Sequence, residues 1–206
     1  MRVKAMIEVY TQNLGGFWFG VACDQQQIVA STFNANQQAT LNNMLEIIPY
    51  NIPFQVFDTP SDFAETALSF LKKIYDGEAV NANFPLAFAS LPAYTQRVLK
   101  ATLQIPLGYV TSYGAIAEAV GGSPRAVGNV MASNPFAPII PCHRVVKSDL
   151  TLGGYGGGLK VKVELLNREK KGHLTSAQVT VDGRLLEVFP VEYVLRSNLF
   201  SDETLC

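Results

Sequence analysis

The sequence predicts an α+β fold, with an N-terminal antiparallel sheet-and-helix domain followed by a mostly helical domain that contains a helix-turn-helix. Short segments in which apolar and polar residues alternate come first, and such alternation is typical of strands. A helix with apolar residues on one face follows them. Beyond Leu91, short helical patterns separated by glycines replace the alternation. These three observations predict the order of the two domains.

The alternating segments within residues 1–33 are predicted to form a small antiparallel sheet. They read VKAMIEVY, FWFGVA and IVASTF. Gly15–Gly16 and Asp24–Gln25 stand between them as turn residues. The segments therefore indicate three strands joined by short loops.

One longer helix is predicted after this sheet. In Thr59-Pro60-Ser61-Asp62, Thr59 suits the N-cap and Pro60 suits the first helical position. The apolar residues that recur on one helical face are Phe63, Ala67, Phe70, Leu71 and Ile74. Gly77 ends the helix, and residues 78–91 have the composition of a linker.

The second half of the chain predicts three helices. The first runs from about Pro92 to Leu103 and precedes the extended stretch IPLGYVTSY. Ser112 is the expected cap of a helix over about 113–120, and Ser123 that of a helix over about 124–132. A glycine pair separates these two helices, which is the outline of a helix-turn-helix. Helices joined by glycines also occur in proteins that do not bind DNA.

Residues 174–206 form a C-terminal extension with the pattern of a β-hairpin. Within AQVTVDGRLLEVF at 177–189, apolar residues alternate with polar ones on both sides of Asp182–Gly183, a strong two-residue turn. An isolated hairpin is marginally stable in water, so we expect it to dock on the protein. Deleting it is then expected to lower thermal stability and to spare the chemistry. The alternative is a mobile tail.

The cysteine and histidine content argues against both disulfides and metals. The chain has three cysteines, Cys23, Cys142 and Cys206, and an odd, sparse set favours a reducing compartment. Its two histidines, His143 and His173, form no metal-binding spacing with them. No zinc or other metal site is therefore expected.

The chain has no apolar run of about 18 residues that would cross a membrane. The N-terminal MRVKAMIEVYTQN has the pattern of a strand, not of a signal peptide. We therefore expect a cytoplasmic protein, or a nuclear one in a eukaryote, that does not bind membranes.

The net charge of −1 hides an asymmetry along the chain. Residues 1–89 carry −4, residues 90–173 carry +6 and residues 174–206 carry −3. A basic segment between acidic flanks fits a nucleic-acid surface confined to the middle of the chain, although ordinary surface variation gives the same pattern.

The segment PCHRVV, residues 141–146, is the candidate site of chemistry. His143 and Arg144 follow Cys142, and Lys147 is close in sequence. A thiolate is the reactive form of cysteine, and nearby cations or a histidine stabilise it. On a strand, however, adjacent side chains would point to opposite faces. The structural alternative, which we favour for Cys23, is a small core residue.

PCHRV closely resembles a motif of the 6-O-alkylguanine-DNA alkyltransferases, also called methylated-DNA–protein-cysteine methyltransferases. SNPFAPII and the RAVG of SPRAVG precede it, and GYGGGLKVKVELLNRE follows it. The resemblance covers residues 91–172 in order and spacing. The first 90 residues fit the family only loosely, and the residues after 173 lie beyond its usual pattern.

The resemblance implies a catalytic set around the cysteine. Cys142 would be the nucleophile and alkyl acceptor, and His143 would take its proton through a water molecule. Glu169 would orient the histidine and support its charge, which is the logic of a catalytic triad. Asn134 would fix the loop that carries the cysteine. The residues alone favour an exposed helix carboxylate for Glu169. They leave open a buried core histidine for His143 and an ordinary turn residue for Asn134.

The resemblance also implies a DNA-binding helix. Arg125 would fill the gap left by the extruded base, and Tyr113 would contact the flipped nucleotide. The small residues that let this helix approach DNA closely are Ala126, Gly128, Ala132 and Ser133. The alternatives are a phosphate contact for Arg125 and half-buried packing for Tyr113.

The loop LGGYGGGL, residues 152–159, would close over the base. In the implied alkylguanine pocket, Tyr113 and Tyr155 offer rings and Gly156 offers its amide. Main-chain carbonyls near Cys142 and Val145 would accept hydrogen bonds from the guanine amino group. Many relatives carry a hydroxyl or methyl side chain where this chain has Gly156, so a roomier pocket is expected. A glycine run is also typical of a flexible loop or a phosphate cradle, but it lacks the Lys-Ser/Thr of a P-loop.

Taken together, the resemblance implies direct, irreversible and stoichiometric repair of 6-O-methylguanine, and of 4-O-methylthymine, in duplex DNA after base flipping. Residues 1–90 would be a structural domain and residues 91–173 the DNA-binding and alkyl-transfer domain. The partner would be double-stranded DNA with alkylated guanine, and neither a cofactor nor an obligate protein partner is expected. The rival hypotheses are a cysteine hydrolase and a lesion-binding module without chemistry.

Overall fold

The computed structural model describes residues 6–24, 27–48, 52–80 and 84–199. Its strands are β1 (Ile7–Leu14), β2 (Phe17–Cys23), β3 (Ile28–Asn34), β4 (Phe54–Phe57), β5 (Tyr109–Ser112), β6 (Val145–Val146), β7 (Ala177–Val181) and β8 (Arg184–Pro190). Its α-helices are α1 (Gln37–Ile47), α2 (Asp62–Tyr75), α3 (Ala93–Leu103), α4 (Tyr113–Val120), α5 (Pro124–Ala132), α6 (Leu159–Arg168) and α7 (Val191–Leu199). Short 3₁₀ helices are η1 (Phe88–Ser90) and η2 (Cys142–Arg144).

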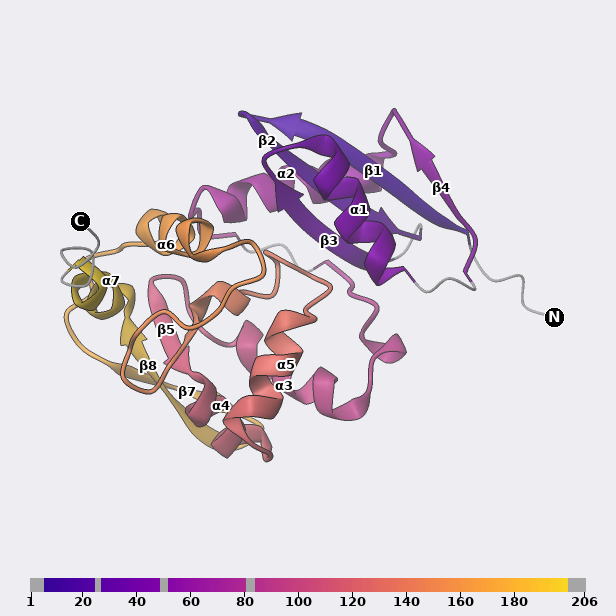
Figure 1. The fold of residues 1–206 in the computed structure, drawn as a ribbon. Helices are drawn as coiled ribbons and strands as arrows, with labels where there is room; N and C mark the ends of the chain where they lie inside the picture. Colours follow the sequence, from indigo (N-terminus) through magenta and orange to yellow (C-terminus); the bar gives the residue numbers. More distant parts are fainter. Residues whose placement is uncertain (1–5, 25–26, 49–51, 81–83, 200–206) are drawn as a thin grey trace. The chain divides into compact units, whose positions relative to one another are not determined.

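The chain forms two compact units, and both mix helices with strands (Figure 1). Unit 1 lies within residues 1–75, 79–90 and 135–139. Unit 2 lies within residues 76–78, 91–134 and 140–206. The α+β class predicted from the sequence is confirmed. None of the described helices is long and apolar enough to cross a membrane.

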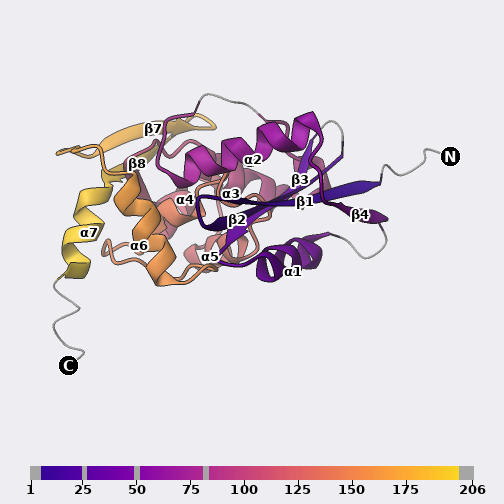
Figure 2. The ribbon, with the colours of Figure 1, turned by 90° about the horizontal axis from the view of Figure 1, so that it is seen from above.

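The core of unit 1 is a four-stranded sheet in the order β3-β2-β1-β4. The three predicted strands pair antiparallel, and β4 adds a parallel edge strand that the sequence did not indicate. Helices α1 and α2 cover opposite faces of this sheet (Figure 2). The close approach of α1 requires a glycine in β2, because a Cβ at Gly20 would lie 2.7 Å from the Met44 side chain.

Two details of unit 1 differ from the sequence prediction. Helix α2 begins at Asp62, and the Ala64 amide donates to the Ser61 hydroxyl, so Ser61 caps the helix in place of Thr59. The expected linker is also partly structured. The Ile28 amide donates to the Pro85 carbonyl, which pairs this segment with the start of β3.

Helices α3, α4 and α5 pack together in unit 2. The predicted caps of α4 and α5 are confirmed: Ser112 accepts from the Ala115 amide at 3.0 Å and Ser123 from the Ala126 amide at 3.2 Å. The turn between these helices needs glycine, since Gly121 and Gly122 have φ of 82° and 109°. The helix-turn-helix outline of the sequence is thus present.

The C-terminal segment completes a second sheet, in the order β6-β5-β8-β7. The hairpin of β7 and β8 turns at Asp182 and Gly183, which both have positive φ. β8 pairs with β5, and the Thr111 hydroxyl donates to the Glu187 carbonyl at 2.6 Å. Helix α7, absent from the sequence prediction, buries Val191 and Val194 against Leu166 of α6. The extension is therefore part of the core of unit 2.

Candidate active site

The reactive segment is a 3₁₀ turn, not a strand. The Cys142 amide donates to the Ile140 carbonyl at 2.8 Å, and the Arg144 amide donates to the Pro141 carbonyl at 2.9 Å. β6 follows directly and pairs with β5. Cys142 is 7% exposed and His143 is fully buried. The turn therefore holds both side chains inside unit 2.

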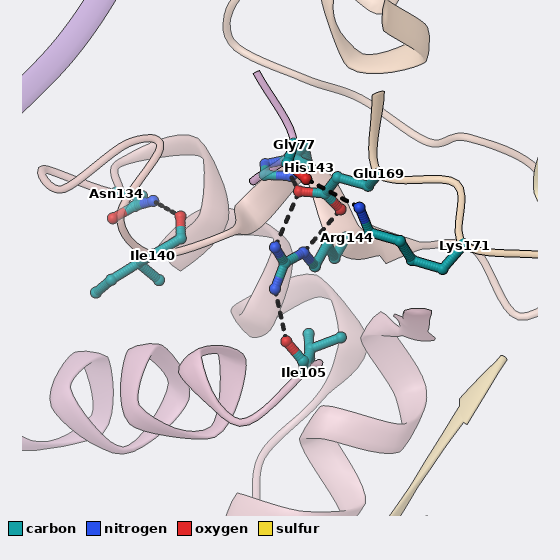
Figure 3. A network of polar contacts seen from close by, with 8 residues as sticks. All are labelled: Gly77, Ile105, Asn134, Ile140, His143, Arg144, Glu169 and Lys171. Carbon is teal, nitrogen blue, oxygen red and sulfur yellow. Dashed lines mark hydrogen bonds and ion pairs between the residues drawn. The ribbon is translucent and has the colours of Figure 1, made fainter. Parts of the chain in front are cut away.

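A buried histidine and carboxylate lie side by side at this turn (Figure 3). The His143 Nε2 lies 2.8 Å from the Glu169 Oε1. Arg144 donates to both oxygens of Glu169 at 2.9 Å, and its third donor reaches the Ile105 carbonyl at 2.7 Å. Glu169 at the end of α6 is thus a fully bonded acceptor, not an exposed helix carboxylate.

The protonation states follow from this geometry. Burial by itself raises the pKa of Glu169, but the charges and hydrogen bonds of His143 and Arg144 outweigh it and lower the pKa to about 2. Burial lowers the pKa of His143, although Glu169 acts to raise it. The imidazole is therefore neutral at pH 7 and donates through Nε2. Its Nδ1 has no hydrogen-bond partner in the described part of the chain, so it is free to accept a proton.

The low pKa of Glu169 predicts how stability depends on pH. The carboxylate contributes stability above its unfolded pKa of 4.5, and this contribution is lost as pH falls toward 2. The loss is about 3 kcal/mol in the wild-type protein. The Glu169→Gln variant is expected to show a flatter stability curve in this window when urea unfolding is measured from pH 2 to 6. Glu118→Gln, an exposed carboxylate on α4, is the control, and parallel curves for wild type and Glu169→Gln would contradict the assignment.

The thiol of Cys142 is protonated at rest. Burial raises its pKa, while a hydrogen bond from Asn134 and the charge of Lys162 act to lower it. The Asn134 side-chain amide also donates to the Ile140 carbonyl at 2.9 Å (Figure 3). This bond joins the end of the α5 segment to the residues that lead into the reactive turn. The sequence hypothesis that Arg144 activates the thiol is not supported, because its guanidinium is bound to Glu169.

Sequence reasoning missed Lys162, which is fully buried beside the site. Its ammonium donates to three main-chain carbonyls, of Val145 at 2.7 Å, of Gly154 at 3.3 Å and of Leu152. Burial lowers the pKa of Lys162 to about 8, and Cys142 acts against this shift. The side chain therefore joins β6 to the glycine-rich loop and places a cation near the thiol.

Cys142 opens into a pocket of about 440 Å³. The pocket is lined by Tyr113, Gly128, Met131, Ala132, Cys142, Gly154, Tyr155 and Gly156. Tyr113 is the first residue of α4, and its hydroxyl donates to the Gly154 carbonyl at 3.4 Å. A Cβ added at Gly156 would meet no atom within 4 Å, so this position leaves open space in the pocket.

Six of the predicted site residues do not line this pocket, namely Arg125, Ala126, Asn134, His143, Val145 and Glu169. The Val145 side chain is buried, and its carbonyl already accepts from Lys162. Arg125 and Ala126 lie on α5, and Arg125 lines a neighbouring cavity. Among the described residues, no group of three His, Cys, Asp or Glu side chains is arranged to hold a metal ion.

Comparison with known proteins gives consistent matches to one family. Residues 93–171 match the family model described as the DNA binding domain of 6-O-methylguanine DNA methyltransferase. The methylated-DNA–protein-cysteine methyltransferase of Pyrobaculum aerophilum is 61% identical over 67 residues, which span 32% of this chain and 45% of that protein. The chain thus matches less than half the length of this archaeal relative.

A longer match and a solved structure extend the comparison. The methylated-DNA–protein-cysteine methyltransferase of Mycobacterium leprae is 47% identical over 116 residues, which cover 55% of this chain and 69% of that protein. The crystal structure of Mycobacterium tuberculosis OGT in complex with DNA is 28% identical, with a TM-score of 0.62 over 79% of this chain and 92% of that one. The chain therefore belongs to the methylated-DNA–protein-cysteine methyltransferase family.

Proposed function

We propose that this protein repairs DNA by moving an alkyl group from O6 of guanine to its own Cys142, once and irreversibly. The observation that carries the proposal is the position of Cys142. It lines a pocket, and the residue that follows it, His143, forms a buried pair with Glu169. Family membership supports the same reaction. We extend the substrates to 4-O-methylthymine, whose alkylated oxygen is chemically similar.

The proposed reaction needs a base, because the Cys142 thiol is protonated at rest. The free Nδ1 of His143 accepts the thiol proton through a water molecule, and Glu169 stabilises the resulting imidazolium. The sulfur then forms a bond to the alkyl carbon while the bond from that carbon to O6 breaks. Guanine leaves and takes up a proton, and a stable thioether remains on the protein.

The target oxygen is inaccessible within stacked DNA, so the nucleotide must be extruded into the pocket. We propose that α5 faces the DNA, since its exposed Arg125 stands beside small residues at 126 and 128. Unit 2 is then the DNA-binding and transfer domain, and unit 1 is structural. The sparse cysteines fit a reducing compartment, which is the cytoplasm or a eukaryotic nucleus.

Intact mass spectrometry tests this function directly. The protein is incubated with a duplex oligonucleotide that contains 6-O-methylguanine, and one added methyl group per protein molecule is expected. A cysteine hydrolase would show no lasting mass change, and a lesion-binding module would bind the duplex and leave its methyl group in place. Either of these outcomes would overturn the proposal.

Replacement of Arg125 by alanine is expected to slow transfer from duplex DNA much more than reaction with free 6-O-benzylguanine. The free base needs no extrusion, so it does not depend on a side chain that fills the vacated stack. Single-turnover rates on the two substrates give the comparison. An arginine that contacts only phosphate would instead lower DNA affinity. Its loss would make the slope of the logarithm of the binding constant against the logarithm of salt concentration shallower by about 0.9. An equal loss on both substrates would count against either role.

A further inference from the structure

A second cavity adjoins the reactive pocket and has no part in the reaction described above. It measures about 330 Å³. It is lined by Tyr113, Pro124, Arg125, Gly128, Asn129, Lys147, Gly153 and Gly154. Three of these residues, Tyr113, Gly128 and Gly154, also line the reactive pocket. The two cavities therefore share a wall.

The second cavity is suited to an anion. Arg125 and Lys147 are both exposed cations on its lining, and none of the described residues that line it is acidic. The N-terminus of α5 adds the positive end of a helix dipole, with Pro124 at the first position. Asp149, two residues after Lys147, accepts hydrogen bonds from the Thr151 amide and hydroxyl at 2.9 and 2.7 Å, and its charge offsets part of that of Lys147.

Lys147 lies beside the glycine-rich loop. Gly153 has a φ of 65°, and a Cβ there would lie 3.1 Å from the Tyr113 ring and 3.5 Å from the Lys147 Cγ. The stem of Lys147 is therefore at ordinary contact distance from this position of the loop. Gly128 and Gly154 leave open space on the shared wall, since an added Cβ at either would meet no atom within 4 Å.

We propose that the second cavity binds a DNA phosphate that flanks the extruded nucleotide, with Lys147 as the contacting cation. The proposal rests on the proposed function, because an extruded base in the reactive pocket brings its own backbone to the adjoining cavity. Arg125 keeps its separate role, in which its side chain fills the gap that the extruded base leaves between the stacked base pairs. Lys147 thus joins the DNA interface from the loop after the reactive turn, a part of the chain remote in sequence from the helix-turn-helix.

Duplex binding by fluorescence polarisation tests this assignment without relying on the chemistry when the wild type and each variant also carry Cys142→Ala, which prevents transfer from 6-O-methylguanine during the measurement. A single uncharged methylphosphonate is placed in turn at each phosphate around 6-O-methylguanine. One flanking position is expected to weaken wild-type binding about two- to fivefold, the size of one exposed ion pair. Lys147→Gln should show this loss already with unmodified phosphates and should be insensitive to methylphosphonate at that position. Its salt slope should fall by about 0.9.

Lys170→Gln is the matched control, because Lys170 is an exposed lysine that follows the C-terminal end of α6 and lines neither cavity. It should keep the wild-type methylphosphonate pattern. If Lys147→Gln responds to every methylphosphonate as the wild type does, the phosphate site is wrong. Failure of the proposed function would look different, since the wild type would then bind DNA without gaining mass in the transfer assay.

Discussion

Replacement of Cys142 by alanine is expected to abolish alkyl transfer and to leave affinity for duplex DNA within about twofold, since sulfur makes no phosphate contact. The acceptor atom is lost, and neither the cations of the DNA interface nor the helix-turn-helix changes. Intact mass measures the transfer, and fluorescence polarisation measures the binding.

Cys23→Ala is the matched control for this experiment. Burial raises the pKa of Cys23 to about 12, and its strand belongs to unit 1, so it should accept no alkyl group. The Cys23→Ala protein should therefore gain one methyl group, as the wild type does. Methylation of the Cys142→Ala protein would show that the acceptor has been assigned to the wrong residue.

Deletion of the chain after Gly172 is expected to unfold unit 2 and to remove the transfer activity with it. The apolar side chains of this segment that are almost fully buried are Val181, Leu186, Val188, Val191, Val194 and Leu195. Their burial contributes on the order of 10 kcal/mol, which is comparable to the stability of a whole domain. The sequence alone led us to expect that the chemistry survives this deletion. The structure leads us to expect its loss, because β8 pairs with β5, the strand that leads to Tyr113. Circular dichroism and amide exchange across unit 2 measure the effect.

Two neighbouring leucines of β8 provide a finer test than the deletion. Leu186 is fully buried, whereas Leu185 is 66% exposed. Leu186→Ala should lower the free energy of unfolding by about 2–5 kcal/mol, and Leu185→Ala should change it by about 0.5 kcal/mol or less. Equal effects of the two substitutions would mean that the hairpin is not docked.

The sequence predicted best where local chemistry decides the structure. The serine caps and glycine turn of the helix-turn-helix, and the Asp182–Gly183 turn, depend on a few adjacent residues, and all are present. Helix α1 was missed because its sequence, QQATLNNMLEI, is mostly polar and buries only Thr40 and Met44. Strand β4 has four residues and joins the sheet through a partner far along the chain, which a local pattern does not reveal.

The site shows the same division between local and long-range information. The resemblance named His143 and Glu169, which the structure places in contact, but Arg144, which also binds Glu169, was given a different role. Lys162 was overlooked because lysine is normally exposed. Its position was a usable signal: it lies three residues before the buried Leu165 and therefore on the buried face of α6.

The burial of Cys142 also affects how long an unused molecule keeps its acceptor. Peroxide oxidises thiolates, so a protonated thiol that is 7% exposed reacts slowly with it. Oxidation to the sulfinic acid is irreversible for most proteins and would end the useful life of a molecule that acts once. Burial in the pocket keeps the thiol protonated until an alkylated nucleobase enters. The same burial therefore protects the thiol from oxidation while the molecule is unused.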